Sequence, residues 1–165
     1  MARFIDPFAS NIFVDANILD DVADGEDVAV NEIVRLENSC EITLFLPYSV
    51  QNELKNPSTP AHVLRAAHLF PYSVEVGLTD GELRRFRDLV AAVKGNAEEK
   101  NIAPDLFHVC ESEKHGGGYF ITRDKRLLAR TDVIASFLEI GVVTPTVFLD
   151  RVSEARQRAA KFGKR

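Results

Sequence analysis

Residues 11–14, with the sequence Asn-Ile-Phe-Val, form a short run of strand-favouring residues that does not alternate between apolar and polar. A strand with one solvent-exposed face alternates between apolar and polar residues, whereas a strand buried on both faces carries a continuous apolar run. Strands of the second kind occur almost only in parallel sheets with helices on both faces. This segment therefore predicts an α/β fold, and it leaves Asp15 at the carboxyl end of a buried strand.

The rest of the chain repeats the alternation of short apolar strands and amphipathic helices. Thr79 and Glu82 form the sequence signature of a capping box, and three glycines at 116–118 end the helix that Pro104 opens. We expect Ser49 to cap a short helix that ends at Pro57. Strands are expected at 11–14, 41–47, 72–76, 119–124 and 142–145, and helices at 26–39, 49–57, 61–70, 79–95, 103–115, 125–141 and 146–162. This order predicts one domain over residues 1–165, a three-layer α/β/α sandwich with a mainly parallel central sheet.

The composition agrees with a single globular domain. The 165 residues are 45% hydrophobic and 27% charged, which suits one core and argues against global disorder. No run approaches the roughly 20 apolar residues of a membrane span, and the amino terminus lacks a secretory pattern. We therefore expect a cytoplasmic protein with no membrane partner. Both cysteines, Cys40 and Cys110, are expected to be buried thiols.

Charge is unevenly distributed along the chain. The net charge at pH 7 is -5, yet residues 151–165 contain six Lys or Arg and a single Glu. This basic C-terminal helix and tail either holds phosphate groups or is a solvated helix end, and the sequence leaves both interpretations open.

Carboxylates occur where the chain reaches the carboxyl ends of the predicted strands, which is where open α/β sheets bind ligands. Asp15 and Asp124 end two strands, and Glu53 lies in the short helix after a third. Asp105 opens a helix, whose free N–H groups and dipole favour an anion. Four acids at one edge repel one another unless they share a cation. Oxygen ligands without a matched Cys or His spacing indicate Mg²⁺ or Mn²⁺, which promote phosphodiester hydrolysis.

Four strings of the sequence resemble the PIN domain family in order and spacing: FVDANIL, PYSVQNEL, PDLFHVC and YFITRDKRLL. The likeness extends from about Phe13 to the closing VVTPTVFLDRV. It implies a metal-dependent endoribonuclease with RNA as substrate, as in the VapC-like toxins of toxin–antitoxin pairs. An antitoxin protein would then be a partner, and such domains often form homodimers. The family also includes RNA-processing nucleases, and this chain is longer than the short toxins.

The resemblance also implies a role for each polar residue of these strings. Asp15 and Asp105 would be the main metal ligands, and Asp124 would bind a second ion directly or through water. Glu53 would position or deprotonate the attacking water, or ligate the second ion. Two further residues would support the metal ligands: Asn17 and Thr122.

Simpler interpretations stay open for several of these residues. Asp15 could cap a turn, and Asp105 could be an ordinary acid in a first helical turn. His108 and His115 could face the cleft of Asp105, but surface or hydrogen-bonded histidines are commoner, and we leave both outside the catalytic set. Two basic residues either contact an RNA phosphate or lie in solvent at the start of a helix: Lys125 and Arg126.

A second class of function also stays open. A non-catalytic PIN-like module would use the same scaffold to bind RNA or a protein, while its acids hold an ion or cap turns. A phosphotransfer receiver domain ranks below both, because no aspartate ends the predicted strand at 41–47.

Overall fold

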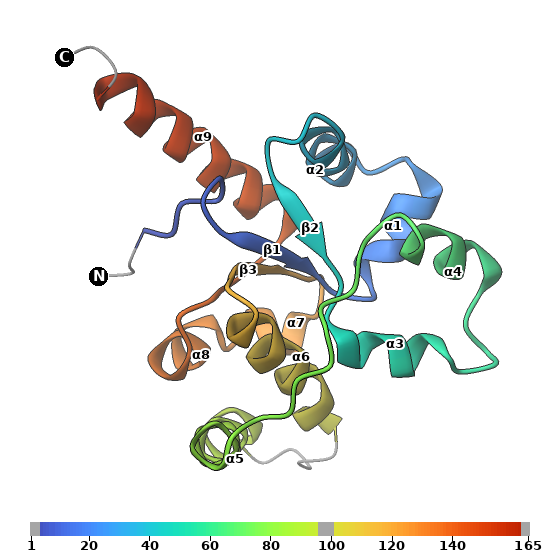
Figure 1. Ribbon diagram of the computed structural model, residues 1–165, viewed down its shortest axis with the longest axis vertical. Helices are drawn as coiled ribbons and strands as arrows, with labels where there is room; N and C mark the ends of the chain where they lie inside the picture. Colours follow the sequence, from blue (N-terminus) through green and yellow to red (C-terminus); the bar gives the residue numbers. More distant parts are fainter. Residues whose placement is uncertain (1–3, 96–100, 163–165) are drawn as a thin grey trace.

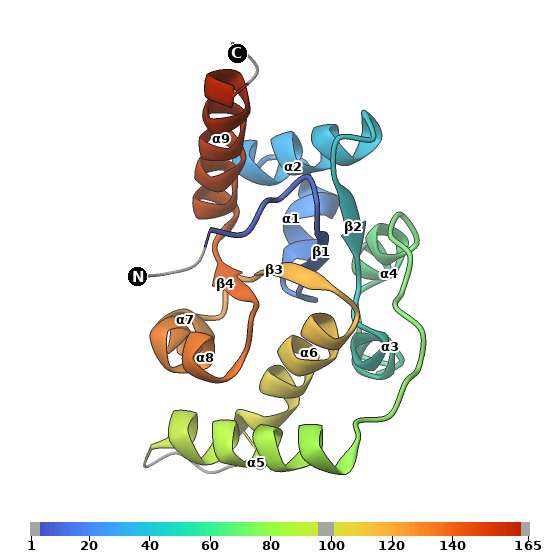
Figure 2. The same cartoon turned by 60° about the vertical axis from the view of Figure 1, so that its left-hand side comes forward.

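The computed structural model describes residues 4–95 and 101–162, which contain a four-stranded sheet in the order β2-β1-β3-β4 (Figure 1; β4 is labelled in Figure 2). All pairings between neighbouring strands of this sheet are parallel. The strands are β1 (Asn11–Val14), β2 (Thr43–Phe45), β3 (Gly117–Ile121) and β4 (Gly141–Val143). The prediction of an α/β fold with a parallel sheet is confirmed.

The two central strands direct their side chains alternately to the two faces of the sheet. β1 contributes Ile12 and Val14 to one face and Phe13 to the other, each at most 1% exposed. β3 alternates in the same way, and its Phe120 joins Phe13. Burial on both faces explains why residues 11–14 read as a continuous apolar run.

Helices cover both faces of the sheet (Figure 2). One hydrophobic core joins the Ile12 face to α1 (Ile18–Asp24), α2 (Val28–Asn38), α3 (Tyr48–Leu54), α4 (Ala61–Ala67) and α9 (Pro145–Phe162). A second core joins the Phe13 face to α5 (Asp80–Lys94), α6 (Ala103–Lys114), α7 (Lys125–Leu128) and α8 (Thr131–Phe137). The predicted three-layer sandwich is therefore confirmed for the described residues.

Local signals explain where several helices begin and end. The hydroxyl of Thr79 accepts the N–H of Glu82 at 3.3 Å, and the Glu82 carboxylate accepts the N–H of Thr79 at 2.7 Å. This is the predicted capping box of α5. Pro104 lies in the first turn of α6, as expected. Gly116, with a φ of 75°, turns the chain from α6 into β3.

Three elements differ from the sequence prediction. Helix α1 was not expected, because its short stretch after Asp15 carries a weak periodic signal. The helix predicted at 125–141 is divided into α7 and α8 at Arg130, whose φ of -124° and ψ of 16° are not helical. The strand predicted at 72–76 reduces to one parallel bridge between Tyr72 and Leu46.

Two predicted side-chain environments are wrong. Ser49 does not cap α3, because Pro47 occupies the N-cap position and Ser49 lies inside the helix. Cys40 is exposed in a turn after α2, where its φ is 58°. Cys110 is buried as expected, and burial raises the pKa of its thiol to about 12.

The outer edge of β2 is covered by other parts of the chain. The N–H of Leu44 donates to the Glu37 carboxylate of α2 at 2.8 Å, and the N–H of Leu46 donates to the carbonyl of Pro71 at 2.9 Å. The N–H of Ser73 in turn donates to the carbonyl of Leu46 at 2.9 Å. Both outward donors of this strand end are thus taken within the protein.

The basic C-terminal segment is helical as far as Phe162, and residues 163–165 of the predicted tail lie outside the described residues. All three arginines of α9 are paired with carboxylates: Arg151 with Glu154 at 3.1 Å, Arg156 with Glu41 at 2.5 Å and Arg158 with Glu154 at 2.6 Å. Among the described helices, none has both the length and the apolar character required to cross a membrane.

Replacing Gly117 with alanine should destabilise the fold by about 1–3 kcal/mol, the usual cost of overpacking a core. A Cβ atom there would lie 2.6 Å from the carbonyl oxygen of Ser112 and 3.0 Å from side-chain atoms of Phe13 and Ile140. Urea unfolding measures the change. Gly81→Ala is the matched control, because a Cβ at Gly81 meets nothing within 4 Å and alanine favours helix α5. Equal free energies of unfolding for the two variants would contradict this packing.

Candidate functional site

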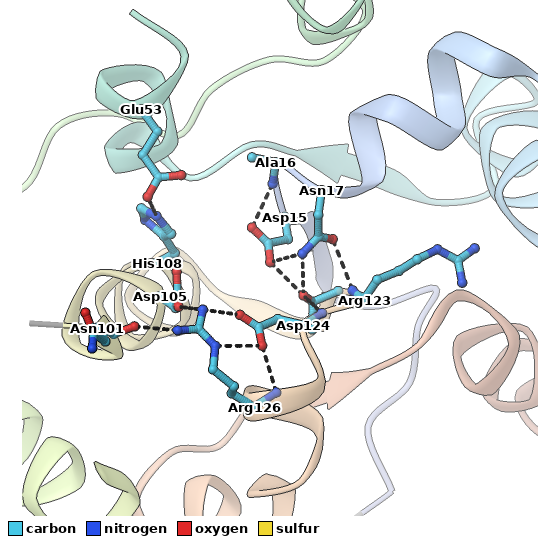
Figure 3. A network of polar contacts seen from close by, with 11 residues as sticks. Asp15, Ala16, Asn17, Glu53, Asn101, Asp105, His108, Arg123, Asp124 and Arg126 are labelled. Carbon is cyan, nitrogen blue, oxygen red and sulfur yellow. Dashed lines mark hydrogen bonds and ion pairs between the residues drawn. The ribbon is translucent and has the colours of Figure 1, made fainter. Parts of the chain in front are cut away.

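Polar side chains from four segments gather at the carboxyl ends of β1 and β3 (Figure 3). Asp15 follows β1, Asp124 follows β3, Asp105 lies in the first turn of α6 and Glu53 lies in α3. The carboxylate of Asp105 is close enough to Asp15 and Asp124 for their negative charges to raise its pKa. The negative charge of Glu53 raises the pKa of Asp15 in the same way. The structure therefore brings the four predicted acids to one edge of the sheet.

Asp15 is a nearly buried carboxylate, 9% exposed. Its Oδ1 accepts the N–H of Ala16 at 2.7 Å. Its Oδ2 accepts the Thr122 hydroxyl at 2.6 Å and the Asn17 amide at 2.8 Å. Burial raises the pKa of Asp15, and the hydrogen bonds from Thr122 and Ala16 offset only part of this effect. All three donors are neutral groups, so they leave the negative charge of Asp15 in place.

Asn17 and Thr122 join the loops that follow β1 and β3. The hydroxyl of Thr122 is fully buried, and besides donating to Asp15 it accepts the amide of Asn17 at 3.1 Å. It also accepts the N–H of Asp124 at 3.0 Å. The Asn17 side-chain oxygen accepts the N–H of Arg123 at 3.0 Å. Both residues thus hold the loop of Asp15 against the loop of Asp124.

The guanidinium of Arg126 bridges two of the acids. It lies 2.7 Å from an oxygen of Asp105 and 2.7 Å from an oxygen of Asp124. It also donates to the carbonyl of Asn101 at 2.7 Å. Burial opposes ionisation of Asp124, but hydrogen bonds from the side chain and backbone of Arg126 outweigh burial and lower its pKa. The sequence left Arg126 either on an RNA phosphate or in solvent, and the structure places it as the counter-ion of Asp105 and Asp124.

Asp105 is hindered from ionising despite this contact. Burial raises its pKa to about 6, and the charge of Arg126 offsets only part of the effect. The negative charges of Asp124 and Asp15 act in the same direction as burial. A carboxylate in this environment gains stability from a nearby cation.

Glu53 pairs with a histidine that the sequence did not place in the catalytic set. His108 Nε2 lies 2.8 Å from Glu53 Oε1, and the His108 side chain is 4% exposed, against 43% for Glu53. The hydrogen bond from His108 is the main reason why the pKa of Glu53 is lowered. Ligand atoms of Glu53, Asp105 and His108 all lie within 4.8 Å of one another. These three residues are close enough to hold one metal ion between them.

His108 also binds residues behind the site. Its Nδ1 lies 2.6 Å from the hydroxyl of Ser49, which donates to Glu111 at 2.5 Å. Burial acts to lower the pKa of His108, but the Glu53 hydrogen bond and the nearby carboxylates outweigh it, so the pKa is raised.

One sequence signal would have found part of this network. His108 follows Asp105 by three residues and Glu111 follows His108 by three, and this spacing places side chains on one face of a helix. Ser49 and Arg126 carried no comparable signal, because their partners are far apart in the sequence or depend on a side-chain rotamer. His115 lies at the opposite end of α6 from Asp105 and does not belong to the site.

The raised pKa of Asp105 predicts a distinct pH dependence of the free energy of unfolding in buffer that contains EDTA. Its pKa of about 6 exceeds the usual 3.8, so the folded protein keeps a proton that the unfolded chain has released. The stabilising contribution is fully present below about pH 4 and is lost as the pH rises through about 6. Urea unfolding across this range should show a loss of stability in wild type that Asp105→Asn lacks.

Asp132→Asn is the control for this measurement, because Asp132 is an exposed aspartate in the first turn of another helix, α8. Its stability should follow that of wild type over the same pH range. If Asp105→Asn also follows wild type, the raised pKa of Asp105 is contradicted.

No protein-family model, curated protein sequence or solved structure matches this chain. What the protein does is therefore inferred from the acids at the strand ends and from the groups that contact them. These groups are four carboxylates, one buried imidazole and one bridging guanidinium, all at the edge where parallel α/β sheets bind ligands.

Proposed function

We propose that the protein is a metal-dependent endoribonuclease that hydrolyses RNA phosphodiester bonds with Mg²⁺ or Mn²⁺ at the strand ends. The observation that carries this proposal is the meeting of four carboxylates from separate segments at one edge of a parallel sheet. Acids that repel one another there are stabilised by a shared divalent cation. The resemblance of four sequence strings to the PIN domain supports the same function.

The donor set fits a hard divalent cation. Asp15, Asp105 and Asp124 supply carboxylate oxygens, the ligands that Mg²⁺ and Mn²⁺ prefer. Glu53 adds a fourth carboxylate, with a ligand atom within 4.8 Å of one on Asp105. The bound ion would neutralise phosphate and lower the pKa of a coordinated water. The fit has one condition, which is that Arg126 must release Asp105 and Asp124 before both can bind the ion.

The other polar groups have defined tasks in this proposal. Thr122 and Asn17 hold the Asp15 carboxylate in a fixed orientation. Glu53 has a lowered pKa and a partly exposed carboxylate, so it can accept a hydrogen bond from a water that enters the site. Arg126, once released, and the exposed Lys125 beside it can bind a phosphate of the RNA backbone.

We extend the proposal to the toxin half of a toxin–antitoxin pair, on the strength of the likeness to VapC-like PIN domains. In that setting the partner is an antitoxin protein and the assembled form is a homodimer. An RNA-processing nuclease would use the same site on a different RNA. A small gene that overlaps or abuts the gene of this protein would favour the toxin.

A non-catalytic module that binds RNA or a protein is the second candidate. The observation that favours it is the Arg126 bridge, since this guanidinium contacts both Asp105 and Asp124 and offsets one of their two negative charges without any ion. Two of the four acids then have a structural partner of their own. Such a module would bind its ligand with the acids in place or replaced.

Purified protein should cleave RNA with Mg²⁺ or Mn²⁺, and EDTA should abolish cleavage. Asp15→Asn and Asp105→Asn should each lower the cleavage rate strongly. Loss of a residue that merely supports a metal ligand lowers activity by about 10–100-fold, and loss of a ligand itself should exceed this. Both variants should stay folded, because loss of one charge relieves repulsion among clustered acids. Cleavage assays together with circular dichroism test both statements, and Asp132→Asn is the control variant.

Cleavage that survives both EDTA and the two substitutions would exclude the metal mechanism. Mn²⁺ binding without cleavage, with equal retention of RNA by wild type and by the acid variants, would select the non-catalytic module.

Arg126→Gln should raise the affinity for Mn²⁺ in the absence of RNA, because the guanidinium and the ion compete for Asp105 and Asp124. An exposed ion pair is worth up to about 1 kcal/mol, which corresponds to about fivefold in affinity. Electron paramagnetic resonance of free Mn²⁺ measures the change. Arg123→Gln is the matched control. It also removes one positive charge, but Arg123 pairs with Asp21 and Asp27, which are not among the four predicted site acids. Equal effects of the two substitutions would show that no direct competition exists.

A further inference from the structure

A buried polar network runs behind Glu53 and links α3 to α6. It consists of Ser49, His108 and Glu111, and we call it the Ser49 network. Ser49 lies on α3, while His108 and Glu111 lie one turn apart on α6. His108 is 3% exposed and Glu111 is 4% exposed. Among the contacts of residues 4–95 and 101–162, the network reaches the predicted site through His108, whose Nε2 binds Glu53.

The hydrogen atoms of this network follow from its distances. Glu111 Oε2 lies 2.9 Å from the backbone nitrogen of Ser49 and 2.5 Å from its hydroxyl, so Glu111 accepts both bonds. A hydroxyl has one hydrogen, and a hydroxyl that donates to Glu111 can only accept from His108 Nδ1 at 2.6 Å. Nδ1 therefore carries hydrogen, and Nε2 donates to the Glu53 carboxylate at 2.8 Å. The imidazole ring is held at both of its nitrogens.

Packing alone does not account for these buried groups. A charged or polar side chain loses its hydration on burial, and apolar residues of similar volume fill such an interface at a lower cost. Both helices also carry fully buried apolar residues, Val50 on α3 and Val109 on α6. The two helices thus have apolar contacts available, and what the polar network adds is a contact with Glu53 through His108.

Glu53 depends on such an orienting contact. It lies in the last turn of α3, a helix of seven residues, and its side chain is 43% exposed. A long, exposed side chain at the end of a short helix samples several rotamers unless it is held. His108 binds Oε1 and leaves Oε2 of Glu53 available to an ion or to its water.

We propose that Ser49, His108 and Glu111 are positioning residues that hold the Glu53 carboxylate beside Asp105, where it completes the metal centre. This inference rests on the proposed function, because it requires an ion at the strand ends. The network acts through Glu53, so breaking it releases Glu53 without removing any carboxylate.

Titration of the metal-free protein with Mn²⁺, without RNA, tests the inference. Ser49→Ala removes the hydroxyl between Glu111 and His108 and should weaken Mn²⁺ binding by about tenfold, as residues that support a metal ligand typically do. Glu53→Ala should weaken it at least as much. In the double variant, Ser49→Ala should add nothing to Glu53→Ala, because the network then has no carboxylate to position. A purely structural role of Ser49 predicts additive losses instead.

Ser112→Ala is the matched control, because its hydroxyl is also fully buried and also bonds His108, but at the backbone carbonyl. It should change Mn²⁺ affinity by less than about twofold. Ser49→Thr keeps the hydroxyl and should restore most of the affinity. Glu111→Gln provides a second route to the same measurement if Ser49→Ala does not fold, as judged by circular dichroism, and should also weaken Mn²⁺ binding by about tenfold.

The outcomes separate this inference from the proposed function. If wild type binds no Mn²⁺, the metal-dependent function itself fails, and the positioning role fails with it. If wild type binds Mn²⁺ but neither Ser49→Ala nor Glu111→Gln weakens binding, only the positioning role is overturned. Additive losses in the double variant, or unchanged affinity in Glu53→Ala, overturn it as well. A loss through Ser49 that vanishes without Glu53 supports it.

Discussion

β1 and β3 are covered by side chains on both faces, so polar groups on these strands have room only where the strands end. Asp15 and Thr122 occupy those ends, and the 2.6 Å hydrogen bond between them joins the two loops that carry the predicted site. The same burial that fixes this bond also makes the charge of Asp15 difficult to sustain. The location of the site and the raised pKa of Asp15 therefore share one cause, which is the burial of the central strands.

Two basic side chains of different character contact the carboxylates at this edge. Arg126 is exposed, and a guanidinium on a long flexible side chain can move away from Asp105 and Asp124. His108 is buried and held at both ring nitrogens, so it stays against Glu53. In the proposed metal centre, Arg126 is therefore the group that must leave its carboxylates, whereas His108 keeps its contact with Glu53.

The sequence predicted the layers of the fold because continuous apolar runs and helical periodicity are local properties. The same reasoning placed Asp15 and Asp124 at strand ends and Asp105 at the start of a helix on the same edge, since topology alone brings those positions together. It failed where a single side-chain rotamer or a single pair of backbone dihedrals determines the structure. The non-helical backbone of Arg130, for example, divides one predicted helix into two. It also failed at Ser49. Serine is a common helix-capping residue, but this one forms hydrogen bonds with His108 and Glu111, which lie 59 and 62 positions away in the sequence. Contacts of that kind depend on tertiary packing, and no local pattern encodes them.

The covering of the β2 edge limits how this protein can join other chains. Glu37 and the segment around Pro71 take the outward N–H groups of Leu44 and Leu46. A strand of a second molecule would have to displace both before it could extend the sheet on that side. The other edge strand of the sheet is β4, so the protection described here applies to the β2 side alone. The side chain of Glu37 and the backbone of the Pro71 segment thus together close this edge to sheet extension.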